Sequence, residues 1–237
     1  MTEDAWQTSN QSGLMLEWLE ANHCASARKK RLFAFSACRL GWDELRPEVR
    51  RFIEAAEDLV EYPSPGTANT LFQGQFHDAL VSLHRVDLTN LESSTFHLVG
   101  YTVTSMGTTA AIIAAVEDLG EVAPPEAIAA LVREQFRTPS RKARWVSARL
   151  RDRIDTWPSD TRPPDLLLVR EWLTWEGGLV TGLAQAIDED RDWSRMPILA
   201  DALEDAGCNE PALLDHLRQR EAHARGCWAL DLLLGKE

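Results

Sequence analysis

Apolar residues recur at intervals of three and four along most of the chain, from about residue 13 to residue 234, which is the spacing of one helix face. Leu14, Met15, Trp18 and Leu19 give the first example. No stretch shows the sustained period-two alternation, bounded by hairpin turns, that is typical of strands. The sequence therefore predicts an all-α fold, either a multi-helix bundle or stacked helical hairpins.

Residues that start and stop helices divide this pattern. Ser26 is a favoured N-cap type directly before an apolar-periodic segment, and Pro47 stands where a first helical turn tolerates proline. Gly120 is a residue type that commonly ends a helix, and Pro125 is one that the first turn of a following helix tolerates. Further helices are expected over residues 13–22, 72–84, 108–119, 127–136, 140–154, 166–175, 179–189, 196–206, 210–220 and 223–234.

A proline-rich segment at 156–165 is the clearest candidate boundary, because Pro158, Pro163 and Pro164 cannot continue a helix. We expect an N-terminal helical region at 1–155, a linker at 156–165 and a C-terminal helical-hairpin region at 166–237 packed on it. A chain of 237 residues is also compatible with a single domain, so that alternative stays open.

The formal net charge of −12 opposes broad attraction to nucleic acid or to anionic membranes. A basic belt at 133–153 is the local exception, and its candidate contacts to phosphates are Arg141, Lys142, Arg144 and Arg149. A solvated helix face that pairs with the chain's own acids is the alternative that we favour. The segment 93–116 holds no Asp, Glu, Lys or Arg, and we interpret it as a buried core helix rather than a membrane span.

The cysteines indicate a reducing compartment. Cys24, Cys38, Cys208 and Cys227 are too few and too scattered for a disulfide framework in a chain of this length. The first residues are acidic, and no apolar segment typical of a secretory signal follows them. We therefore expect a cytoplasmic protein with reduced thiols and no membrane association.

Two stretches carry a resemblance to a known family. The C-terminal one is Pro197-Ile-Leu-Ala-Asp-Ala-Leu-Glu-Asp-Ala-Gly-Cys208 followed by His223-Ala-Arg-Gly-Cys-Trp228, and the weaker one is Met15-Leu-Glu-Trp-Leu-Glu20 with the basic segment after Arg28. They resemble the tail and the opening of a family of short bacterial proteins that are frequent in planctomycetes. The resemblance implies neither an activity nor catalytic residues, and it does not extend to the middle of the chain.

The C-terminal segment is also where metal chemistry is conceivable. His223 and Cys227 are four residues apart, which would place them on one face of a helix, and Cys208 and His216 precede them. Cys and His are the usual zinc ligands, so a four-ligand zinc site is one hypothesis. The spacing lacks a close Cys-x-x-Cys pair, however, and free cysteines are often buried. Core packing, with no cofactor, is the interpretation that we favour.

Carboxylates and tryptophans give further candidate sites. Asp201, Glu204 and Asp205 could bind a divalent cation with the tail histidines, although ordinary ion pairing, such as that of Glu204 with Arg218 or Arg225, is the interpretation that we favour. Trp172 and Trp175 are three residues apart and could form an exposed patch that binds a partner, although core packing is the alternative that we favour.

We assign no catalytic residues, because no phosphate loop, nucleophile elbow or His-Glu-x-x-His pair is present. We expect a non-enzymatic helical module that binds another protein. A metal-dependent hydrolase or nuclease that uses the C-terminal Asp, His and Cys residues is the first alternative. A nucleic-acid-binding component that uses the basic belt is the second.

Overall fold

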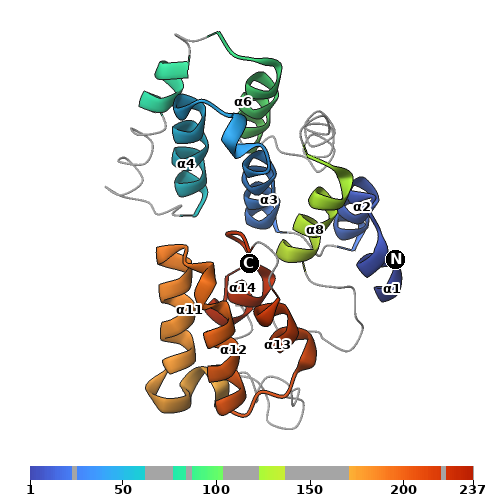
Figure 1. The fold of residues 1–237 in the computed structure, drawn as a ribbon, viewed down its shortest axis with the longest axis vertical. Coiled ribbons are helices and arrows are strands. Elements are labelled where there is room, and N and C mark those ends of the chain that lie inside the picture. The colour runs from blue at the N-terminus through green and yellow to red at the C-terminus, as the bar shows by residue number, and fades with distance from the viewer. Residues whose placement is uncertain are drawn as a thin grey trace. The chain divides into compact units, whose positions relative to one another are not determined.

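The computed structural model describes residues 1–22, 26–61, 77–83, 87–103, 123–136, 171–219 and 223–236. The chain divides into two compact units, Met1–Pro139 and Ser140–Glu237, which we describe separately. All regular structure within the described ranges is helical, which confirms the predicted all-α class (Figure 1). None of the helices in these ranges is both long enough and apolar enough to cross a membrane.

The N-terminal unit is built around the helix that Ser26 was predicted to cap. The Ser26 hydroxyl accepts a hydrogen bond from the Lys29 backbone N–H at 3.1 Å and so starts α3. The elements of this unit, with an additional helical segment at 77–83, are α1 (Glu3–Thr8), α2 (Ser12–Ala21), α3 (Ala27–Arg39), η1 (Trp42–Glu44), α4 (Pro47–Glu61), α6 (Asn90–Val103) and α8 (Pro125–Gln135).

Helix α3 is the centre of this unit. All residues from Leu32 to Cys38 are buried, and a helix that is buried on every side must have neighbours on every side. It packs against α4, α6 and α8, while α2 packs against α8 (Figure 1). Burial raises the pKa of the Cys38 thiol to about 12, so Cys38 is an inert core residue.

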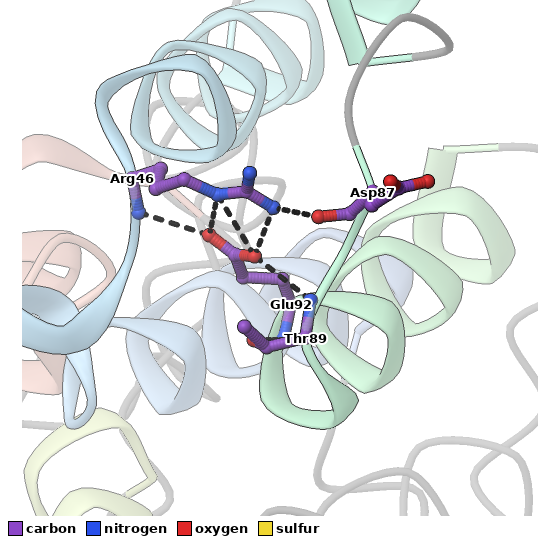
Figure 2. Close-up of polar contacts among 4 residues, drawn as sticks. All are labelled: Arg46, Asp87, Thr89 and Glu92. Carbon is purple, nitrogen blue, oxygen red and sulfur yellow. Dashed lines mark hydrogen bonds and ion pairs between the residues drawn. The ribbon is translucent and has the colours of Figure 1, made fainter.

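A buried carboxylate fixes the start of α6 (Figure 2). Thr89 Oγ1 accepts from the Glu92 N–H at 3.3 Å and Glu92 Oε2 accepts from the Thr89 N–H at 3.0 Å, which is a reciprocal capping box. Arg46 donates to the same carboxylate from its backbone N–H at 3.1 Å and from Nε at 2.8 Å. The Arg46 guanidinium also donates to the Asp87 carbonyl. These contacts join the segment before α4 to the first turn of α6.

The described part of the C-terminal unit, residues 171–219 and 223–236, consists of short helices joined by tight turns. It contains η4 (Trp175–Gly177), α11 (Leu179–Asp190), η5 (Trp193–Arg195), α12 (Met196–Asp205), α13 (Pro211–Arg218) and α14 (Trp228–Leu234). Helix α11 packs against α12 and α14, and α13 packs against both α12 and α14. Its apolar core includes Trp172, Ile187, Met196, Leu203 and Leu230.

Most predicted helices within the described ranges are present with small shifts of their ends. The last one is shorter than predicted, because the chain turns at 224–227 before α14 begins at Trp228. The predicted helices did not include α1 or the first turn of α6, although Thr89-x-x-Glu92 is a capping-box signal. The predicted helices at 108–119 and 140–154 and the predicted linker at 156–165 lie outside the described residues.

Candidate functional site

Three of the four predicted metal ligands meet in the C-terminal unit. The ligand atoms of His216, His223 and Cys227 all lie within 4.8 Å of one another. Nε2 of His216 lies 3.2 Å from Sγ of Cys227, and the centroids of the His216 and His223 rings are 5.3 Å apart. Cys227 is fully buried, His216 is 8% exposed and His223 is half-buried. Three side chains of ligand type therefore converge at the edge of the core.

A tight turn, and not a helix face, brings His223 next to Cys227. The Cys227 N–H donates to the Ala224 carbonyl at 3.0 Å, and Gly226 has a φ of 83°, which a side chain would strain. Cys227 is then the N-cap residue of α14. The predicted arrangement on one helix was wrong, because α14 begins only at Trp228 and both residues precede it, but the turn still places the two residues at the same cluster.

The two nitrogens of the His216 ring have different neighbours. Its Nδ1 lies 3.3 Å from the side-chain amide of Gln219, while its Nε2 points to Cys227. The Trp228 ring lies 4.8 Å from the imidazole, centroid to centroid. A histidine held at one nitrogen by an amide and covered by an indole presents its other nitrogen in a fixed direction.

Cys208 is not part of this cluster among the described residues. It follows the end of α12, where its N–H donates to the Leu203 carbonyl at 2.8 Å and the Gly207 N–H donates to the Glu204 carbonyl at 2.9 Å. This is a Schellman motif, whose second residue after the cap is commonly apolar. Cys208 is 4% exposed in the core, and burial raises the pKa of its thiol. The predicted fourth ligand instead packs at a helix end.

Arg218 of α13 holds the carboxylates of α12. Its Nη2 donates to Asp201 Oδ1 at 2.7 Å and also to Glu204 Oε2. The predicted pairing of Glu204 with Arg218 is thus confirmed. The hydrogen bond from Arg218 lowers the pKa of the Glu204 carboxyl. An acid pair that is already bound to a guanidinium is a poor candidate for the catalytic metal site of a hydrolase.

One side of helix α12 is exposed and carries both apolar and acidic side chains. Ile198 is 54% exposed, and exposed acidic or proline residues surround it on the same side of the helix. We call this surface the α12 outer face, and it consists of Pro197, Ile198, Asp201, Glu204 and Asp205. The opposite side of α12, with Leu199 and Leu203, is buried in the core.

The alternative of an exposed patch formed by Trp172 and Trp175 does not agree with the exposure of Trp172. Trp172 is 3% exposed and belongs to the core of the C-terminal unit, whereas Trp175 is half-buried and packs against that core. Trp172 contributes apolar contacts to the core in this position, as the favoured packing alternative expected. Only Trp175 offers part of its ring at the surface.

Within the described ranges, the basic belt at 133–153 contributes one basic residue, Arg133. Arg133 Nη1 donates to the Ser9 carbonyl at 2.8 Å and to the Trp6 carbonyl at 3.4 Å, so it binds carbonyls at the C-terminal end of α1. The four predicted nucleic-acid contacts, Arg141, Lys142, Arg144 and Arg149, lie outside the described residues.

No family model matches the chain, and neither a curated protein nor a solved structure gives a match.

Proposed function

We propose that the protein is a non-enzymatic helical module that binds another protein through the α12 outer face. The observation that carries this proposal is the exposure of Ile198, whose side chain is 54% accessible in the midst of acidic residues. An apolar centre with a charged rim is the usual composition of a protein-binding surface.

The chemistry of the face defines the partner. Asp201 and Asp205 lie three and seven residues after Ile198, so all three share one side of the helix. The whole chain carries a net charge of −12, which attracts a basic partner and repels an acidic one. The expected partner is a protein segment that presents an apolar side chain next to Lys or Arg.

The surface is built on rigid elements. The buried side of α12 packs in the core, and Arg218 links Asp201 and Glu204 to the adjacent helix α13. A fixed backbone lowers the ordering cost of association. The buried thiols of Cys38 and Cys208 suit a reducing compartment, so we also propose a cytoplasmic location.

The test is affinity capture from the native host with the full chain, compared with Ile198→Glu and with Leu14→Glu. Leu14 is the matched control, because it is 53% exposed and lies in the N-terminal unit. The proposal expects one protein to be retained by the wild type and by Leu14→Glu, and lost with Ile198→Glu. Retention of that protein by Ile198→Glu would rule out the α12 outer face.

A further inference from the structure

The geometry points to a zinc site in the C-terminal unit that uses three protein ligands, His216 Nε2, His223 and Cys227 Sγ. This site is separate from the α12 outer face and does not depend on the proposed partner. One thiolate and two imidazoles form a donor set that suits zinc better than Mg²⁺ or Ca²⁺, which prefer oxygen.

The distances fit this assignment. When a Zn–S bond of about 2.3 Å and a Zn–N bond of about 2.0 Å meet at the tetrahedral angle, the sulfur and nitrogen atoms lie about 3.5 Å apart. The observed distance between His216 Nε2 and Cys227 Sγ is 3.2 Å. The third ligand atom, from His223, is within 4.8 Å of both, and side-chain rotation of this half-buried residue can complete the site.

The surroundings of His216 fit a metal-bound histidine. Coordination through Nε2 requires the proton on Nδ1, where the amide of Gln219 lies 3.3 Å away. The Gln219 atom at this distance is the amide Nε2, which donates and cannot accept that proton, so the amide has to flip and present its oxygen to Nδ1. Gln219 is therefore a positioning residue for the ligand, and Trp228 covers the ring.

The ligands also connect separate segments. His216 belongs to α13, His223 precedes the turn at 224–227, and Cys227 caps α14. A zinc ion bound by all three would tie the end of α13 to the start of α14, and the binding free energy would contribute to folding. The fourth position of the tetrahedron is left for water or another donor.

A matched pair of cysteine variants distinguishes this three-ligand site from a four-ligand site that includes Cys208. Cys227 and Cys208 are both buried cysteines of the same unit, but only Cys227 belongs to the cluster. The full chain, produced with added zinc and purified without chelator, should carry about one zinc per chain. Cys208→Ser should keep that content, and Cys227→Ser should lose it.

Cobalt gives a second readout. Co²⁺ bound to the wild type and to Cys208→Ser should show a thiolate-to-cobalt charge-transfer band, which Cys227→Ser should lack. Gln219→Leu should keep the band and bind about 10-fold more weakly, because it removes only the support of His216. Circular dichroism of each variant checks that its helices are intact.

If Cys227→Ser fails to fold, the melting temperature of the wild type alone still tests the proposal. Added zinc should raise the melting temperature of chelator-treated protein, because a ligand that binds only the folded state stabilises it. Wild-type protein that retains its helices, binds neither zinc nor cobalt and melts at the same temperature with and without zinc would overturn the proposal. Zinc lost from Cys208→Ser but kept by Cys227→Ser would overturn it as well.

Discussion

Glu92 accepts hydrogen bonds from both the backbone and the guanidinium of Arg46, a residue 46 positions earlier in the chain. The Glu92 side chain has no exposed surface, while that of Arg46 is 37% exposed. The same carboxylate closes the capping box with Thr89. One side chain thus links the start of a helix to a distant part of the N-terminal unit (Figure 2).

Replacement of this carboxylate should weaken the start of α6. Glu92→Gln keeps the size of the side chain but removes the negative charge that accepts from Arg46, at a cost of about 2–3 kcal/mol. Hydrogen exchange, followed by mass spectrometry over peptides from 87–103, should become faster in the variant. Glu204→Gln is the control, because Glu204 is 48% exposed and its ion pair with Arg218 is screened by solvent, so its loss should destabilise the fold much less. Equal effects of the two variants would contradict the role of Glu92.

The stability contributed by Glu92 should depend on pH. The hydrogen bond from Arg46 lowers the pKa of Glu92 from 4.5 to about 2 in the folded state. The folded state therefore binds this proton less readily than the unfolded state, so the contribution is complete above about pH 4.5 and is lost as the pH falls towards about 2. The difference in melting temperature between wild type and Glu92→Gln should shrink over that window. A difference that stays constant would show that this pKa is not lowered.

Two glycines of the C-terminal unit should respond to alanine in opposite directions. A Cβ at Gly182 or at Gly207 would meet nothing within 4 Å, so the two positions differ in backbone conformation and not in the space available for a side chain. Gly182 lies inside α11 and Gly182→Ala should stabilise by about 0.5–1 kcal/mol, whereas Gly207 has a φ of 88° and Gly207→Ala should destabilise by about 1 kcal/mol. Shifts of the melting temperature test both signs, and a stabilising Gly207→Ala would contradict the Schellman geometry.

Trp172 and Trp175 should differ in their contribution to stability. Trp172→Ala removes a ring that is 3% exposed in the core and should cost about 3–5 kcal/mol. Trp175→Ala should cost clearly less, because Trp175 is half-buried. Thermal unfolding of both variants checks the order. If Trp172→Ala were tolerated and Trp175→Ala were not, the assignment of Trp172 to the core would be incorrect.

The helical class and several helix ends could be predicted from the sequence, because both depend on neighbouring residues. Ser26 caps α3 by a bond to a backbone N–H three residues away, and Pro47 begins α4 as expected. Such contacts need no knowledge of the rest of the fold. The short helix α1 was missed although Thr2 caps it by accepting from the Ala5 N–H at 3.2 Å, while the contacts of Arg133 with its last carbonyls come from a distant helix, α8, and could not be predicted locally.

The cluster of His216, His223 and Cys227 likewise depends on both local and distant contacts. The sequence by itself supplied the candidate side chains, because residue type is a property of short segments, but it predicted a helix across residues 223–234 where the chain instead turns before Trp228. Only the tertiary structure decided that His216 and Cys227 meet while Cys208 packs after Leu203, and that Trp172 is buried while Ile198 is exposed. Those outcomes depend on how α11, α12, α13 and α14 pack together, which the spacing of residues along one helix does not specify.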